Sequence, residues 1–389
     1  MTAADETTES GRPARMEGAE GDGIEEHRQA VGELVADAFG PDRCRVERLT
    51  DVNRGRGAFS VVLRAELTGI GPNGEEQPPG AVPSSVVAKL PVDGPNGRAA
   101  TIGGAYAREA LAYRTIIADS PVRAPLLHAI RQPADGTCSL LLEDLGRYRA
   151  ADQLDGLEVV DALRVAASLR RLHRAWADKS RLAGLSVRRN TVGGFTPDGL
   201  RLGLAALDTR WADHVTDDHR RTFRDLVAVR AGLVERFEAA PQTLCHGDPR
   251  ADNLVFDDTR EIDDQLNTER TGAPCDGDGD ETEGEPRSGT DAVILFDWQQ
   301  LAVQFGEADL AWLAATSLTA PVRRELDRQL AAAYDGDLDR YRLGFALPGL
   351  AVLMLAQRDF PTERARRFVA VSLQRIATAL DDLEVAALG

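Results

Sequence analysis

The sequence has few cysteines, and they follow no pattern that would cross-link the chain or hold a metal. Cys44, Cys138, Cys245 and Cys275 are scattered over 389 residues, form no CxxC pair and follow no secretory signal. We therefore expect reduced thiols in a cytoplasmic protein rather than a disulfide framework. Cys245 adjoins the motif described below, where a nucleophile is one interpretation, but its neighbours favour a packing residue at a strand end.

The sequence also lacks a hydrophobic run long enough to cross a bilayer. Its longest apolar stretch, 343–356, is interrupted by Pro348. A membrane-spanning helix needs about 20 predominantly apolar residues. We therefore expect no membrane partner.

The sequence has fewer basic than acidic residues, with 46 Lys and Arg against 63 Asp and Glu, which gives a formal net charge of −17. Most of that deficit lies in two segments: 1–26 has a net charge of −6, and 257–291 has −10. The rest of the chain is therefore nearly neutral, and the two acidic segments have the composition of disordered chain. We expect no nucleic-acid partner, and the net charge says little about a substrate.

What the sequence does contain is a change of pattern near residue 146. Before it, five strand-like runs (44–49, 59–67, 85–90, 128–131 and 138–142) accompany helical patterns over 24–39 and 105–118. After it, helical patterns cover 156–177, 197–211, 217–239, 309–318, 322–334, 338–357 and 361–387. These periodicities predict an α+β protein with a small five-stranded antiparallel lobe and a larger, mostly α-helical lobe.

The expected domain boundaries follow from that change of pattern and from the two acidic segments. A disordered acidic tail covers 1–22, and an N-lobe covers 23–145. A helical C-lobe covers 146–389. Within the C-lobe, 257–291 is a disordered acidic insertion at the tip of a hairpin formed by 254–256 and 293–296, where extra length costs little.

The run 246–253, which reads HGDPRADN, says most about chemistry, together with Asp297 at the end of an apolar run. Phosphoryl transfer needs a base for the nucleophile's proton and metal ions for the phosphate oxygens. Asp248 is suited to the role of base. Asn253 and Asp297 supply oxygen ligands of the kind that magnesium, a hard cation, prefers.

This order of motifs resembles the aminoglycoside phosphotransferase and choline kinase-like superfamily, small-molecule relatives of the protein kinases. Its members are similar in carrying His-Gly-Asp-x-x-x-x-Asn and then Asp before Trp or Phe. The segments 140–145 and 297–299 look most like the ecdysteroid-kinase-like branch, bacterial type. The resemblance covers roughly residue 49 to the C-terminal helices. It implies a bilobal protein-kinase-like fold, with ATP and Mg²⁺ as cofactors. The N-lobe, 23–145, would then bind the nucleotide, and the C-lobe, 146–389, would carry the catalytic loop and the acceptor site.

The resemblance also implies roles for single residues: Asp248 as catalytic base, and Asn253 and Asp297 as magnesium ligands. It further implies that Lys89 contacts nucleotide phosphates and that Glu109, on the helix flanking that strand, orients it. The alternative for Lys89 is a surface lysine that extends its ammonium into water.

Two further groups of residues are expected near the nucleotide. Gly55, Gly57 and Ser60 occupy the glycine positions of a G-x-G-x-x-G-x-V loop, which would cover the phosphates unless it is only a hairpin turn. Glu143 and Leu145 lie in the expected connection between the lobes, where backbone groups would contact adenine.

Arg250 lies two residues after the proposed base. A guanidinium there would stabilise charge on the transferred phosphate. The alternative is a structural pair with Asp252 or Asp309.

Two residues are expected to support the loop that carries Asp248. His246 precedes the base and would brace the loop. Asp309 would cap the next helix while bonding to the loop, a role that the superfamily's similar Asp-Leu-Ala element favours.

We therefore expect an ATP-dependent kinase that phosphorylates a hydroxyl of a small-molecule alcohol. A catalytically silent pseudokinase is the alternative, although neither the lysine, the base nor a metal ligand is missing. A protein substrate is disfavoured, because no Ala-Pro-Glu element follows Asp297. The sequence leaves the acceptor and the oligomeric state open.

Overall fold

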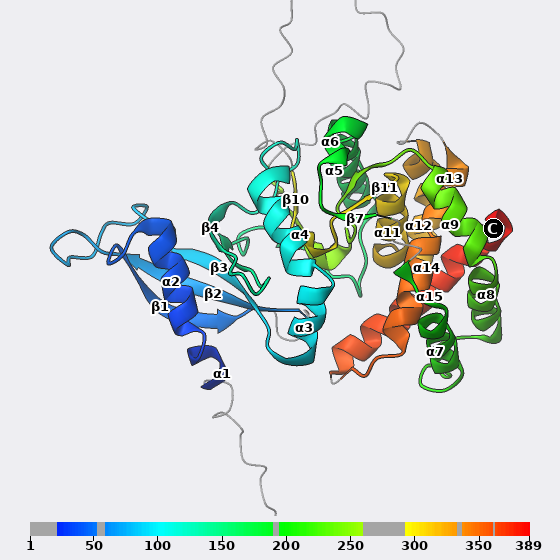
Figure 1. Cartoon of the computed structure of the whole chain (residues 1–389), viewed down its shortest axis with the longest axis horizontal. Helices are drawn as coiled ribbons and strands as arrows, with labels where there is room; N and C mark the ends of the chain where they lie inside the picture. The colour runs from blue at the N-terminus through cyan, green and yellow to red at the C-terminus, as the bar shows by residue number, and fades with distance from the viewer. Residues whose placement is uncertain (1–21, 53–58, 190–193, 260–291, 333–336, 361) are drawn as a thin grey trace, which may run out of the picture.

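The computed structural model describes residues 22–52, 59–189, 194–259, 292–332, 337–360 and 362–389. They form two lobes, a small one built on a sheet and a larger helical one (Figure 1). The predicted tail 1–22 and most of the predicted insertion 257–291 lie outside the described residues. Among the residues described, no helix has the length and apolar character needed to cross a membrane.

The N-lobe sheet has the five predicted strands in the antiparallel order β1-β2-β3-β5-β4. Their bounds are β1 Cys44–Asp51, β2 Ser60–Gly69, β3 Ser85–Pro91, β4 Leu127–Arg131 and β5 Ser139–Glu143. Each agrees with the predicted run to within two residues, because short runs of strand composition mark these strands in the sequence.

Strand β5 shows how the sheet divides two hydrophobic cores. Leu141 packs into a small core with helix α2 (Arg28–Phe39), whereas Leu140 and Leu142 point into the main core of the protein. Successive side chains of a strand face opposite sides. Helix α2 therefore covers the outer face, and the inner face joins the large lobe (Figure 1).

The inner face of the sheet is next to helix α4 (Ala105–Leu111), which continues as the π-helix η1 (Ala112–Ile116). Together they account for the helix predicted over 105–118. Helix α4 also packs against the 3₁₀ turn η4 (Trp298–Gln300) of the large lobe. Two further helices lie earlier in the chain, α1 (Asp22–Glu25) and α3 (Gly94–Ile102). Helix α3 was not predicted.

The C-lobe is mostly helical, as predicted, but two expected helices are each divided in two. The patterns over 217–239 and 338–357 break at Val229 and at Phe345, where one helix ends and the next begins. The helices are α5 Val159–Ala175, α6 Lys179–Ala183, α7 Pro197–Asp208, α8 Asp217–Ala228, α9 Arg230–Ala239, α11 Glu307–Ser317, α12 Ala320–Ala332, α13 Leu338–Gly344, α14 Ala346–Ala356 and α15 Glu363–Asp382, followed by η5 Val385–Leu388.

Two small sheets in the C-lobe carry the chemistry-bearing loops. One has the order β10-β9-β6 and includes the predicted hairpin, with Leu254 opposite Leu295. The other has the order β7-β11-β8. Their bounds are β6 Arg149–Ala150, β7 Arg188–Arg189, β8 Thr243–Cys245, β9 Leu254–Phe256, β10 Val293–Leu295 and β11 Ala302–Gln304. The run 246–253 therefore joins β8 to β9, and Asp297 follows β10.

Candidate active site

Lys89 connects the two lobes through a pair of carboxylates. Its Nζ lies 2.6 Å from Oε1 of Glu109 on α4 and 2.9 Å from Oδ1 of Asp297 in the C-lobe. Only 12 % of the Lys89 side chain is exposed. Burial lowers the pKa of the ammonium, but the two carboxylates outweigh burial and raise it. The predicted Lys89–Glu109 ion pair is present, and Lys89 is a fixed cation rather than a surface lysine.

Asp297 holds its position in an unusual backbone conformation. Its φ of 63° and ψ of 64° lie in the left-handed region, which costs a non-glycine residue about 1–2 kcal/mol. The paired strand β10 before it and the turn η4 after it impose this conformation. Burial raises the pKa of its carboxyl, but the Lys89 ammonium outweighs burial and holds the pKa below its ordinary value. Asp297 is therefore a carboxylate aimed at Lys89.

Asp248 lies in the loop after β8 and receives hydrogen bonds on both carboxylate oxygens. The indole Nε1 of Trp312 donates to Oδ1 at 2.8 Å, and Asn253 Nδ2 donates to Oδ2 at 3.1 Å. Burial raises its pKa to about 6, although the Arg250 guanidinium acts in the opposite direction. A carboxylate with such a pKa is well matched to accepting a proton near neutral pH.

A buried carboxylate from helix α11 fixes the loop that carries Asp248. Asp309 Oδ2 accepts from the backbone N–H of His246 at 2.7 Å, and its Oδ1 accepts from that of Gly247 at 2.9 Å. We expected Asp309 both to cap its helix and to bond to this loop. The bonds to the loop are present, but the N-cap position belongs to Gly306.

His246 fixes the same loop from within. Its Nε2 lies 3.1 Å from the carbonyl oxygen of Phe296, and its Nδ1 accepts from the N–H of Asp248 at 3.3 Å. Nδ1 is therefore unprotonated and Nε2 is the donor. Burial lowers the pKa of the imidazole, which agrees with this neutral form. The predicted supporting role of His246 agrees with these contacts.

Arg250 contacts the proposed base instead of the partners that the structural interpretation assigned to it. Its Nε lies 3.4 Å from Oδ2 of Asp248. The guanidinium also lies over the ring of Phe368 on α15, 5.5 Å from the ring centroid. The carboxylate of Asp252 instead accepts from the N–H of Gln153 at 3.0 Å. Arg250 is thus a half-buried cation beside Asp248.

The side chains of Asn253 and Asp297 are suited to a magnesium ion. The backbone brings the two residues together, because the N–H of Phe296 donates to the carbonyl of Asn253 at 3.1 Å. Asn253 uses its amide nitrogen on Asp248, which leaves the amide oxygen for a metal. Asp297 uses Oδ1 on Lys89 and retains Oδ2. Two hard oxygen donors on adjacent strand ends are what Mg²⁺ takes from proteins.

The predicted phosphate loop lies only in part within the described residues. Gly55 and Gly57 are outside them. Ser60 begins β2, is buried, and accepts a hydrogen bond from Gln299 Nε2 at 3.1 Å. The same amide group donates to Oε2 of Glu109 at 3.1 Å. Ser60 thus lies against the partner of Lys89, on the N-lobe side of the site.

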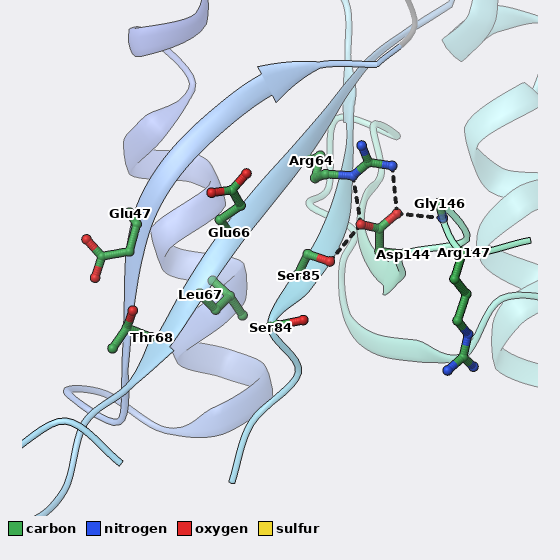
Figure 2. A pocket seen from close by; sticks show the side chains of 10 residues that line it. All are labelled: Glu47, Arg64, Glu66, Leu67, Thr68, Ser84, Ser85, Asp144, Gly146 and Arg147. Atoms are coloured by element: carbon green, nitrogen blue, oxygen red, sulfur yellow. Dashed lines mark hydrogen bonds and ion pairs between the residues drawn. The ribbon is translucent and has the colours of Figure 1, made fainter. Parts of the chain in front are cut away.

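The predicted connection between the lobes is held by side chains. Glu143 accepts from Arg147 at 3.1 Å through Oε1, and the carbonyl of Leu145 accepts from the N–H of Tyr148 at 3.0 Å. Between them, Asp144 binds Arg64, Ser85 and the N–H of Gly146 (Figure 2).

A hollow of about 630 Å³ lies beside Asp144 on the sheet (Figure 2). None of the predicted site residues that the structure describes lines it. The lining residues are Glu47, Arg64, Glu66, Leu67, Thr68, Ser84, Ser85, Asp144, Gly146 and Arg147. We therefore do not identify this hollow with the chemistry around Asp248.

Cys245 is a packing residue, as its sequence context indicated. Its Sγ is fully buried and lies 3.7 Å and 3.6 Å from the carbonyl oxygens of Gln304 and Phe305. Burial raises the pKa of the thiol well above its ordinary value. Ligand atoms of His173, Cys245 and Asp309 lie within 4.8 Å of one another, but each already has a protein partner. We interpret the group as support for the catalytic loop.

Sequence reasoning missed two residues of the site, Gln299 and Trp312. Gln299 was noted only as part of a family motif. Trp312 had one available signal, because it follows Asp309 by three residues on the same helix and therefore lies on the same face. Once Asp309 is expected to bind the loop, Trp312 is expected near it.

Residues 104–263 match the phosphotransferase enzyme family, APH. No curated protein matches the sequence. Among solved structures, the chain is similar to a choline/ethanolamine kinase family protein from Mesorhizobium loti, at 17% identity and a TM-score of 0.53, covering 94% of this chain and 99% of that one. It is also similar to an ethanolamine kinase from Plasmodium vivax, at 12% identity and a TM-score of 0.50, covering 92% and 89%.

The two structures share the fold with this chain, a five-stranded antiparallel sheet joined to a helical lobe. The family match falls on the segment that contains α4 and the run 246–253. The family match supports a phosphotransferase, and the two solved structures support the fold. The resemblance to the aminoglycoside phosphotransferase and choline kinase-like superfamily, with its protein-kinase-like fold, is therefore confirmed.

Proposed function

We propose that this protein is a small-molecule kinase that transfers the γ-phosphoryl group of Mg-ATP to a hydroxyl of an alcohol. The observation that carries the proposal is the presence of two groups of charged side chains in the site, one around Lys89 and one around Asp248. Lys89 is fixed between Glu109 and Asp297, and Asp248 lies beside Arg250 with a pKa of about 6. Phosphoryl transfer asks the protein for such positioning and charge rather than for covalent chemistry.

Each residue has a distinct task in this proposal. Asp248 accepts the proton of the acceptor hydroxyl as that oxygen attacks phosphorus. Lys89 binds the nucleotide phosphates, held there by Glu109. Arg250 stabilises negative charge on the transferred group from the acceptor side.

Magnesium would be held by Asn253 and Asp297, and when bound it neutralises charge on the phosphate oxygens. The loop with Gly55, Gly57 and Ser60 covers the phosphates. The segment with Glu143 and Leu145 contacts the adenine through its backbone. We propose a small-molecule partner in the cytoplasm, with neither nucleic acid nor a membrane as a partner.

The nucleotide part of the proposal has a test that uses the scarcity of lysine. The chain contains only two lysines, Lys89 and Lys179. An acyl-phosphate derivative of ATP should acylate Lys89, and excess Mg-ATP should protect it. Lys179, which is exposed at the start of α6, is the internal control. Equal labelling of both lysines, unaffected by Mg-ATP, would show that the nucleotide does not bind at Lys89.

A second test measures phosphoryl transfer and distinguishes a kinase from a silent pseudokinase. Wild-type protein is incubated with ATP labelled in the γ-phosphate, Mg²⁺ and a panel of alcohols, and phosphate esters are detected by mass spectrometry. We expect a labelled ester that Asp248→Ala does not form. Protection of Lys89 by nucleotide without ester formation across a broad panel would favour the pseudokinase.

A further inference from the structure

Trp312 contacts the proposed base directly, although no chemistry has been assigned to it. It lies on α11, three residues after Asp309, and its side chain is partly exposed. Its indole Nε1 donates to Oδ1 of Asp248 at 2.8 Å, within the normal range for a strong hydrogen bond. One face of α11 therefore holds both the loop backbone, through Asp309, and the carboxylate of that loop.

The two oxygens of Asp248 have unequal surroundings. Oδ2 has Asn253 Nδ2 at 3.1 Å and Arg250 Nε at 3.4 Å. Within the described part of the chain, Oδ1 has a single hydrogen-bond donor, Trp312. A carboxylate oxygen accepts about two hydrogen bonds. Each oxygen therefore has one hydrogen-bond donor among the described residues, but Oδ2 also has the Arg250 cation beside it, so Oδ1 is the less occupied of the two.

We propose that Trp312 is a positioning residue, whose indole N–H holds Oδ1 of Asp248 so that its remaining lone pair receives the proton of the acceptor hydroxyl. This inference rests on the proposed function. The acceptor oxygen forms a bond to the γ-phosphorus as its proton moves to Oδ1. The bond from the γ-phosphorus to the bridging oxygen breaks, and its electron pair leaves with ADP.

A rigid donor on the carboxylate is needed because the loop itself offers little to fix the rotation of the Asp248 side chain. Asn253 is expected to bind a metal, and Arg250 is expected to bind the phosphoryl group, so both change partners when substrates arrive. Trp312 has no such second task, and its ring packs against the main core. It is thus the contact of Asp248 that persists through the reaction.

The chain provides a spectroscopic test that needs no substrate. It contains four tryptophans, so ¹⁵N-tryptophan labelling gives four indole N–H signals. Trp312→Phe assigns the Trp312 signal. Asp248→Asn should then shift that signal and leave the signal of Trp176, whose indole donates to Ser120, in place. If the Trp312 signal keeps its chemical shift in folded Asp248→Asn protein, the proposal is overturned.

The kinetic test is Trp312→Phe in the full chain, with Trp176→Phe as the matched control, which loses an indole N–H away from Asp248. A hydrogen bond to a charged group corresponds to a factor of roughly 10 to 100. We expect kcat to fall by that factor in Trp312→Phe, with KM for ATP nearly unchanged. An unchanged kcat, or equal losses in both variants, would overturn the role of Trp312.

The two tests separate this inference from the proposed function. The indole signal reports the contact with Asp248 whether or not any alcohol is phosphorylated. Absence of transfer by the wild-type protein would refute the kinase, and with it the role of Trp312 in a reaction. If the protein transfers phosphate but the Trp312 signal does not shift in Asp248→Asn, only the role of Trp312 is refuted.

Discussion

Replacing Asp248 by Asn should make the stability of the protein less sensitive to pH, because the native site keeps a carboxylate where burial opposes its charge. Burial raises the pKa of Asp248 from 3.8 to about 6. A folded-state pKa above the unfolded one means that the folded protein binds more protons between these pH values. The wild-type protein should therefore lose stability as pH rises from about 4 to 6, and the full penalty should remain at higher pH.

The size of the effect follows from the pKa difference. Each unit corresponds to about 1.4 kcal/mol, so the free energy of unfolding should fall by up to about 3 kcal/mol across the interval. The asparagine side chain of the Asp248→Asn variant does not ionise and escapes this penalty. The variant also loses one acceptor for Asn253 or Trp312, but that loss does not depend on pH. The difference between variant and wild type should therefore grow by up to about 3 kcal/mol from about pH 4 to pH 8.

Urea unfolding at half-unit pH steps, without nucleotide or Mg²⁺, measures this difference. Asp119→Asn, at an exposed position paired only loosely with Arg181, controls for the removal of one negative charge from the chain. Asp248→Asn should diverge from wild type between pH 4 and 6 and run parallel to it above. A difference that is constant with pH, or that shrinks as pH rises, would refute the claim that burial raises the pKa of Asp248.

Three further predictions concern the residues around Asp248. Lys89→Met should reduce initial rates of transfer by about 10²-fold or more, because it removes a fixed cation from the phosphates. Asp309→Asn should lower the free energy of unfolding by about 1–3 kcal/mol in urea titrations, since two loop N–H groups share that carboxylate. Gly247→Ala should lower the melting temperature, because its φ is +84° and a Cβ would lie 2.0 Å from the Gln300 carbonyl oxygen.

The sequence was sufficient for the elements that local patterns determine. The strands of the N-lobe alternate visibly, and the hairpin that brings Asn253 next to Asp297 has two short apolar runs of strand composition. The resemblance implied the Lys89–Glu109 contact, which the structure contains. A resemblance of ordered motifs supplied the rest of the candidate site.

Features that depend on distant packing could not be predicted. The helix break at Phe345 is not among them, because Pro348 lacks the N–H that a continuous helix would donate to the Gly344 carbonyl, and this is a local signal. Gln299 and Trp312 reach Ser60 and Asp248 across separations of 239 and 64 residues. Gln299 has no local signature, because it is one of many polar side chains on buried faces. Trp312 could be expected near the loop only through its position one turn after Asp309.

The central claim, that Asp248 is the base of a phosphoryl transfer, is tested most directly by measuring binding and transfer separately in one variant. Titration calorimetry gives the Kd of Mg-ATP, and a single-turnover reaction with γ-labelled ATP and a panel-identified alcohol gives the transfer rate. For Asp248→Asn we predict a Kd within a few-fold of wild type and a transfer rate lower by about 10²–10⁴-fold. A transfer rate close to that of the wild-type protein would contradict the account.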